Sequence, residues 1–133
     1  MKKLFTIMVS ASIFFSCQKS GKPDPQLDAF NTFVGRYLVC DSIKTTSNVT
    51  TTTQVLGKGK GFDRNFGIYG NLEIYSTPPV YRSYDFEGPD KIHYRGPSSE
   101  TSFYTIVSMG GNKLVLRNTD ATGKVLTEYF TAE

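Results

Sequence analysis

From Arg36 to the C-terminus, short runs rich in Val, Ile, Thr, Tyr and Phe alternate with turns rich in Gly, Pro, Asn and Asp. This pattern indicates β-strands, because β-branched and aromatic side chains suit a pleated sheet and the turn residues interrupt it. Between two of these runs, Gly70-Asn71 is typical of a two-residue hairpin turn. We predict eight or nine strands, over residues 36–45, 49–56, 66–69, 72–76, 80–87, 91–95, 101–109, 113–118 and 124–131.

One segment departs from this pattern. Between Leu27 and Val34 the apolar residues have a spacing compatible with one or two helical turns, which Gly35 is expected to end. From Pro79 onward the predicted connections are short, and short turns join antiparallel neighbours. A meander of this many strands hides its edges best by closing on itself. The predicted fold class is all-β: an antiparallel up-and-down meander that closes into a small barrel, preceded by a short helical turn.

Several predicted strands are apolar on both faces. In Thr101–Met109, Phe103 and Tyr104 point to opposite sides, and Lys124–Thr131 has the same character. A solvated antiparallel sheet is normally apolar on one face only. Two explanations stay open: a hollow interior with an aromatic lining, or an outer face covered by the N-terminal turn or by a partner.

The first sixteen residues have a different pattern. Met1-Lys2-Lys3 is basic, Leu4–Phe15 is mostly apolar, and the small residue Ser16 precedes Cys17. This order is typical of a cleaved secretory signal. A transmembrane helix needs about 20 apolar residues, and the apolar run is too short for that. We therefore predict a signal peptide over residues 1–16.

The end of this signal, Phe14-Phe15-Ser16-Cys17, resembles the lipobox of bacterial lipoproteins, and its aromatic form looks like that of Bacteroidetes-type lipoproteins. The resemblance implies that Cys17 becomes the first mature residue and carries two or three acyl chains, which suffice for stable membrane anchoring. The alternative is an ordinary signal peptide followed by a free cysteine. Residues 17–26 are rich in Gly, Pro and polar side chains, which indicates a flexible tether before a domain over residues 27–133.

The charge of the working protein is smaller than that of the whole chain. Lys2 and Lys3 leave with the signal, so 13 of the 15 basic residues remain against 12 acidic ones. A nearly neutral chain without a basic stripe excludes nucleic acid as a partner. In lipoproteins of this type, an acidic cluster after the lipidated cysteine directs the protein to the cell surface, and Gln18-Lys19-Ser20 contains none. We therefore expect an outer-membrane lipoprotein on the periplasmic face.

The stretch from Phe33 to Phe130 resembles the small lipocalin-like domains of Bacteroidetes lipoproteins. It opens with Gly35-Arg36-Tyr37, is rich in Tyr in the middle, and ends with Tyr104-Thr105-Ile106 and Lys113-Leu114-Val115-Leu116. Lipocalins open with Gly-x-Trp, whose ring plugs one end of the barrel, and in this chain Tyr37 takes the place of the Trp. The resemblance implies a module that binds a small hydrophobic or amphipathic ligand.

The residues offer little chemistry for catalysis. His93 is the only histidine and is out of phase with Ile92 and Tyr94, so we expect it at a solvated strand position. Metal sites need several ligands, and an activated nucleophile needs a base. We therefore expect no enzyme, no metal and no cofactor. Cys40, without a disulfide partner, is expected to be a small buried hydrophobe. Asp41-Ser42-Ile43 resembles a Bacteroidetes O-glycosylation site, and modification of Ser42 stays open.

The candidate binding residues are mostly aromatic, since an apolar ring with a polar tip suits a binding site. Arg82 shares a face with Tyr84 and Phe86, so it is either a buried cation that needs an anion or a surface residue. The loop Gly57–Gly61 lacks the Ser or Thr of a phosphate loop, yet it could present Lys58 and Lys60 to an anionic ligand or glycan. The alternative function is a non-enzymatic interaction, accessory or inhibitor protein with a filled barrel that binds an envelope protein or glycan. The candidate ligand contacts are Tyr37, Arg82, Tyr84, Phe86, Phe103 and Tyr104.

Overall fold

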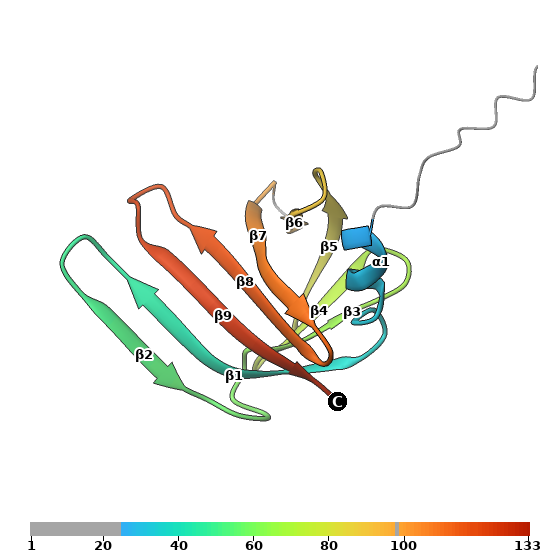
Figure 1. Ribbon diagram of the computed structural model, residues 1–133, viewed down its shortest axis with the longest axis horizontal. Helices are drawn as coiled ribbons and strands as arrows, with labels where there is room; N and C mark the ends of the chain where they lie inside the picture. Colours follow the sequence, from blue (N-terminus) through green and yellow to red (C-terminus); the bar gives the residue numbers. More distant parts are fainter. Residues whose placement is uncertain (1–24, 98) are drawn as a thin grey trace, which may run out of the picture.

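The structure, a computed structural model, describes residues 25–97 and 99–133. The predicted signal peptide, Cys17 and the tether up to residue 24 lie outside the described residues. One helix and nine strands follow one another in this part of the chain (Figure 1): α1 (Pro25–Asn31), β1 (Tyr37–Thr46), β2 (Thr51–Val55), β3 (Asp63–Phe66), β4 (Asn71–Tyr75), β5 (Val80–Phe86), β6 (Lys91–Arg95), β7 (Thr101–Gly110), β8 (Lys113–Thr119) and β9 (Val125–Ala132).

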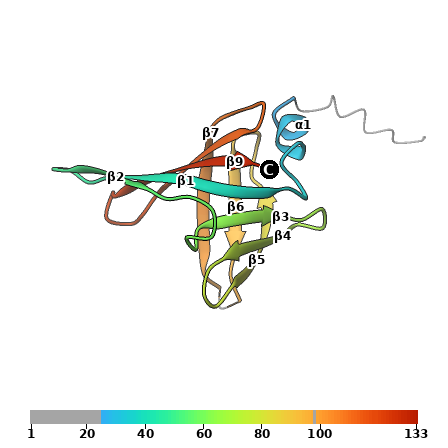
Figure 2. The ribbon, with the colours of Figure 1, turned by 90° about the horizontal axis from the view of Figure 1, so that it is seen from below.

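The strands form one sheet in which every neighbouring pair is antiparallel. β1 closes it, because β1 pairs with β9 along one side and, at Tyr37 and Leu38, with β3 on the other. Eight strands therefore make a closed barrel, and the predicted all-β meander is confirmed. The second half of β1 pairs with β2, which stands outside the barrel as an extra strand (Figures 1 and 2).

The third strand differs from its predicted position at residues 66–69. β3 ends at Phe66, and residues 67–70 form the turn into β4. The amide of Gly67 donates to the carbonyl of Asn71 (2.7 Å), and Gly70 has a positive φ of 76°. The predicted two-residue turn Gly70-Asn71 is therefore wrong: Asn71 already belongs to β4. The four-residue turn 67–70 forms in place of the two-residue turn because a glycine stands on each side of the exposed pair Ile68-Tyr69.

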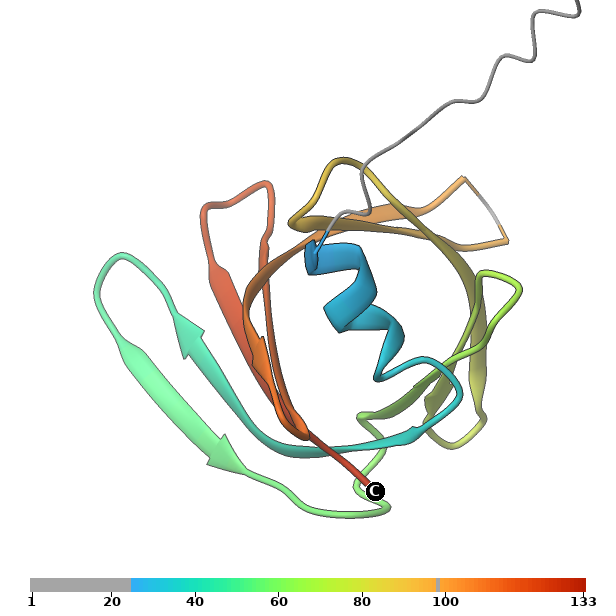
Figure 3. The same ribbon diagram turned by 45° about the vertical axis from the view of Figure 1, so that its right-hand side comes forward.

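Helix α1 closes one end of the barrel from inside its ring of strands (Figure 3). Phe30 and Phe33 are fully buried, and the Phe30 ring meets those of Phe66 and Phe86 edge-on at 5.1 and 4.9 Å. The chain then leaves the helix through Gly35, whose φ of 78° favours glycine and whose amide donates to the Phe66 carbonyl. The short apolar helical segment of the sequence is thus a plug.

The core fills the space inside the strands. Alternate side chains of each barrel strand point inward, as the period of two requires. Arg36 fixes the closure by donating to the carbonyls of Ala132 and Glu133, both at 3.2 Å. The buried apolar side chains that pack as one cluster are Phe30, Phe33, Leu38, Cys40, Ile43, Phe66, Leu72, Ile92, Tyr94, Leu114, Leu116, Phe130 and Ala132.

Candidate functional site

A charged pair lies in the middle of the barrel. Arg64 on β3 and Glu128 on β9 are 4% and 2% exposed, and Nη2 of Arg64 donates to both carboxylate oxygens at 2.6 and 2.7 Å. Nη1 of Arg64 donates to the Tyr94 hydroxyl at 3.0 Å. The guanidinium also lies within 5.0–5.4 Å of the ring centres of Tyr94, Tyr104 and Phe130. These three rings and the Glu128 carboxylate together surround the buried Arg64 guanidinium.

Electrostatics keeps the Arg64 guanidinium charged in this buried position. Burial, the largest single effect, lowers the pKa of Arg64, but the charge of Glu128 together with the Tyr94 and Tyr104 hydroxyls outweighs it, so the pKa rises. Burial raises the pKa of the Tyr94 hydroxyl, which stays neutral and able to accept from Arg64. Nε of Arg64 is buried and has no hydrogen-bond partner among the described residues. The centre of the barrel is therefore occupied by the protein's own polar network, and a ligand inside would compete with it for space.

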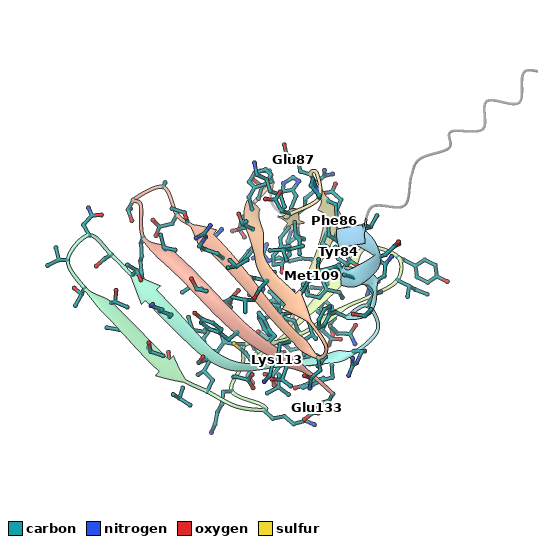
Figure 4. The ribbon with its side chains drawn as sticks, in the orientation of Figure 1. Tyr84, Phe86, Glu87, Met109, Lys113 and Glu133 are labelled. Atoms are coloured by element: carbon teal, nitrogen blue, oxygen red, sulfur yellow. The ribbon has the colours of Figure 1, made fainter. Side chains whose placement is uncertain are left out.

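The predicted contacts on β5 are divided between the two ends of the barrel. Tyr84 and Phe86 point toward α1 (Figure 4), and their rings lie 6.3 and 4.9 Å from Phe30. Arg82 is on the same inner face but further from the helix, and it pairs with Glu100 at 3.2 Å. The sequence left open whether Arg82 needs an anion: it faces inward, and the protein supplies the carboxylate.

Tyr37 lies under the glycine-rich loop. Its hydroxyl donates to Oδ2 of Asp63 at 2.7 Å, and the same oxygen accepts from the Gly59 amide at 2.6 Å. Burial and then the Asp63 carboxylate raise the pKa of Tyr37 to about 12. Oδ1 of Asp63 accepts from the Cys40 amide at 2.8 Å, so this fully buried carboxylate ties three segments together.

The two loop lysines serve different purposes. Lys58 lies 5.1 Å from the centre of the Tyr37 ring and pairs with Glu133. Lys60 is exposed. The loop therefore covers Asp63, with Lys58 beside Tyr37 and Glu133 and with Lys60 exposed to solvent.

The outer face of β5, β6 and β7 has a different character. His93 on β6 stacks on Phe103 of β7, with ring centres 4.4 Å apart and planes 5° apart. Nδ1 of His93 lies 3.2 Å from Nε of Arg95 and 3.3 Å from Oδ1 of Asp85, while Nε2 is buried without a partner in the described part of the chain. The predicted solvated histidine is thus half-covered, because Phe103 lies flat against it.

Apolar side chains remain uncovered on this outer face. Phe103 and Val107 are each 48% exposed, and Tyr81 is 65% exposed. Two shallow hollows of about 310 Å³ meet at Arg95, one beside Tyr81 and the other beside Phe103. Because α1 lies at the end of the barrel, it does not cover this face. The N-terminal turn is therefore not what covers the outer face of β7, which was one of the explanations for strands that are apolar on both sides.

A line of three basic side chains, which sequence reasoning did not predict, crosses the same outer face. The registers place Lys91, Thr105, Arg117, Thr127 and Lys44 in successive cross-strand positions on β6, β7, β8, β9 and β1. The three basic residues are exposed. None of them forms an ion pair with another described residue. Adjacent strands are about 4.8 Å apart, so neighbouring charges lie about 10 Å apart beside Phe103.

The six predicted ligand contacts do not form one site. Tyr104 lies inside, stacked on Tyr94 at 4.4 Å and over Arg64, whereas Phe103 lies outside. Sequence reasoning missed the interior pair, although a signal existed: Glu128 shares its strand face with apolar Leu126 and Phe130. A lone carboxylate among inward-facing apolar residues indicates a buried partner.

The chain was compared with known proteins, and no family model, curated protein or solved structure matches it. Within residues 25–97 and 99–133, no three His, Cys, Asp or Glu side chains gather as a metal site requires. No helix in the described ranges is long and apolar enough to span a membrane. What the structure defines is a class: a small closed β-barrel with a plugged end, a charged centre and an uncovered apolar–basic outer face.

Proposed function

We propose that this protein is a lipid-anchored, non-enzymatic binding module of the bacterial cell envelope that holds a partner protein against the outer face of β5–β8. The observation that carries the proposal is the uncovered Phe103, beside His93 and the two hollows at Arg95. The signal-like first sixteen residues and the lipobox-like sequence before Cys17 support the envelope location.

The chemistry of the face suits a protein partner. Binding energy at protein interfaces concentrates in aromatic and Arg side chains that a polar rim surrounds. Tyr81, Arg95 and Phe103 have this character, and Asp85 lines the hollow beside Phe103. The exposed line of Lys91, Arg117 and Lys44 has no ion-pair partner among the described residues, and it favours a partner with acidic groups because opposite potentials guide association.

A small ligand inside the barrel remains the competing hypothesis. Against it stand Phe30, which fills one end, and the Arg64–Glu128 pair, which fills the centre. A ligand would have to displace side chains of this core, and the displacement would disturb the buried ion pair at a large cost in free energy. The interior therefore supports a structural role, and the outer face supports the binding role.

Site-specific photo-crosslinking in a bacterial host that exports the chain tests the outer face. A photoreactive phenylalanine is placed at Phe103 or Tyr81, and Tyr69 serves as the matched control because it is aromatic, 91% exposed and in the β3–β4 turn. We expect one discrete protein adduct from both test positions and none from the control. The same adduct from Tyr69, or no adduct from the test positions, contradicts the proposal.

Two further measurements separate the parts of the proposal. Incorporation of a labelled fatty acid, lost in Cys17→Ser, tests the anchor. Native mass spectrometry of the purified protein tests the interior: a small molecule that leaves on denaturation supports the competing hypothesis. An adduct at Phe103 that Arg117→Glu removes supports an acidic protein partner, whereas a glycan that protects Phe103 from labelling contradicts it.

A further inference from the structure

We propose that β2 is a self-pairing edge through which two copies of this chain join their sheets, with β2 of one copy antiparallel to β2 of the other. This inference does not depend on the outer-face partner. It begins from the way the barrel closes. β1 passes from β2 to β3 along one side, so β2 is left as the first strand of the sheet, with β1 as its only strand neighbour among the described residues.

Every residue of β2 is exposed. Figure 2 shows the β1–β2 hairpin extending away from the barrel, so neither face of β2 packs on the core. Val55 is 81% exposed, although β-branched apolar side chains suit a sheet surface that is partly buried. A strand that is open on both faces and along one edge lacks the cover that sheet strands normally have.

The hydrogen-bond alternation shows which backbone groups are free. The amide of Leu56 donates to the Asp41 carbonyl and that of Ser47 to the Thr50 carbonyl. In an antiparallel ladder hydrogen-bonded pairs alternate with non-bonded pairs. Even-numbered residues of β2 therefore bond to β1, and the backbone N–H and C=O groups of Thr51, Thr53 and Val55 point to the open edge.

This edge lacks the usual protection against pairing. Natural edge strands carry Lys, Pro, a bulge or a covering segment. Residues 49–55 read Val-Thr-Thr-Thr-Thr-Gln-Val, without charge or proline, and the β1–β2 register is regular. Such a segment combines high β-propensity with zero net charge, which is the composition that pairs with another strand.

The segment also fits a second copy of itself. With Thr53 opposite its equivalent, Thr51 faces the partner's Val55, and the three pairs exchange about six backbone hydrogen bonds. Threonine pairs and β-branched pairs stabilise antiparallel strands. The nearest like charges would be the two Lys44 side chains, which are three strand spacings or about 14 Å apart, beyond the Debye length of about 8 Å. The contact is isologous and closes as a two-fold dimer.

Cysteine crosslinking of the full chain tests this geometry. Thr53→Cys places two thiols directly opposite each other, whereas Thr52→Cys, in the same exposed strand, offsets them beyond bridging distance. With a mild oxidant we expect about tenfold more disulfide-linked dimer from Thr53→Cys than from Thr52→Cys. The parent chain, which keeps Cys17 and the buried Cys40, gives the background.

Sedimentation equilibrium supplies the second measurement. Thr53→Pro removes a donor that faces the open edge and leaves the bonds to β1 intact, so this variant should keep its thermal midpoint and sediment as a monomer. The parent should show a concentration-dependent dimer. Equal crosslinking from both cysteine variants, a monomeric parent, or crosslinking of Thr53→Cys to a different protein overturns the proposal.

Discussion

Replacing Glu128 with Gln removes the negative charge from the barrel centre and keeps the shape of the side chain. Arg64 then stays buried and charged, because the pKa of a guanidinium is too high for it to release its proton. Its remaining contacts are the Tyr94 hydroxyl, three aromatic rings and the one neutral amide oxygen of the new Gln side chain, whose NH2 group now faces the guanidinium. Removing one partner of a buried ion pair costs about 3–5 kcal/mol. We expect Glu128→Gln to lose that much unfolding free energy.

Urea denaturation followed by tyrosine fluorescence or circular dichroism measures this loss. For a small domain the unfolding free energy changes by about 2 kcal/mol per molar urea, so the midpoint should fall by about 1.5–2.5 M. If the variant unfolds without denaturant, the same osmolyte added to variant and parent extends the measurable range. The slope of the transition should stay constant, which shows that the midpoint shift reports stability.

A double-mutant cycle separates the pair from general packing. Arg64→Met with Glu128→Leu replaces both charges by apolar side chains, and such replacements are often neutral or stabilising. We expect the double variant to recover most of the loss seen in Glu128→Gln. A loss below about 1 kcal/mol in Glu128→Gln would refute the reasoning, and so would a double variant worse than the sum of its own single variants, Arg64→Met and Glu128→Leu.

Three further results are expected. Burial raises the pKa of the Cys40 thiol to about 12 from 9.0, so the thiol should react with a disulfide reagent only on unfolding. The stability that Cys40 contributes should be complete below about pH 9 and should be lost as the pH rises toward 12. Urea midpoints measured across this pH range test the expectation. Phe30→Ala should cost about 3–5 kcal/mol, whereas the exposed Leu27→Ala should change the urea midpoint little. Asp63→Ala frees the Gly59 amide, so trypsin should cut after Lys60 much faster than in the parent, and equal cleavage rates would contradict the role of the carboxylate.

The strands could be predicted because their signals are local. β-branched runs between turn residues define β4 to β9 to within a residue or two, and the short connections predict antiparallel neighbours. The third strand was misplaced because Phe66 to Tyr69 is apolar enough for a strand, and only the turn geometry shows that Ile68 and Tyr69 project into solvent. Boundaries depend on hydrogen bonds that composition does not determine.

The candidate site was less accessible to sequence reasoning. Period two shows that Phe103 and Tyr104 point to opposite faces, but not which face is inside. That choice depends on the closure of β1 on β9, which brings Arg64 to Glu128 across 64 residues of sequence. Glu128 among inward-facing apolar residues signals a buried partner. Nothing local identifies Arg64 as that partner or shows which face of β7 lies outside, so both were visible only in the fold.

The sequence by itself determined the all-β class and the meander order, because both depend on composition and spacing along the chain. The export signal stays a prediction from the sequence. The tertiary structure alone decided that Phe30 plugs the barrel, that Arg82 meets Glu100, and that β2 lies outside with one edge that no other described strand pairs with. The physical reason is that the burial and pairing of a residue depend on segments distant in the sequence. The same alternating strand is compatible with a hollow barrel, a filled barrel or an open sheet edge, and only the closure of the sheet determines its neighbours.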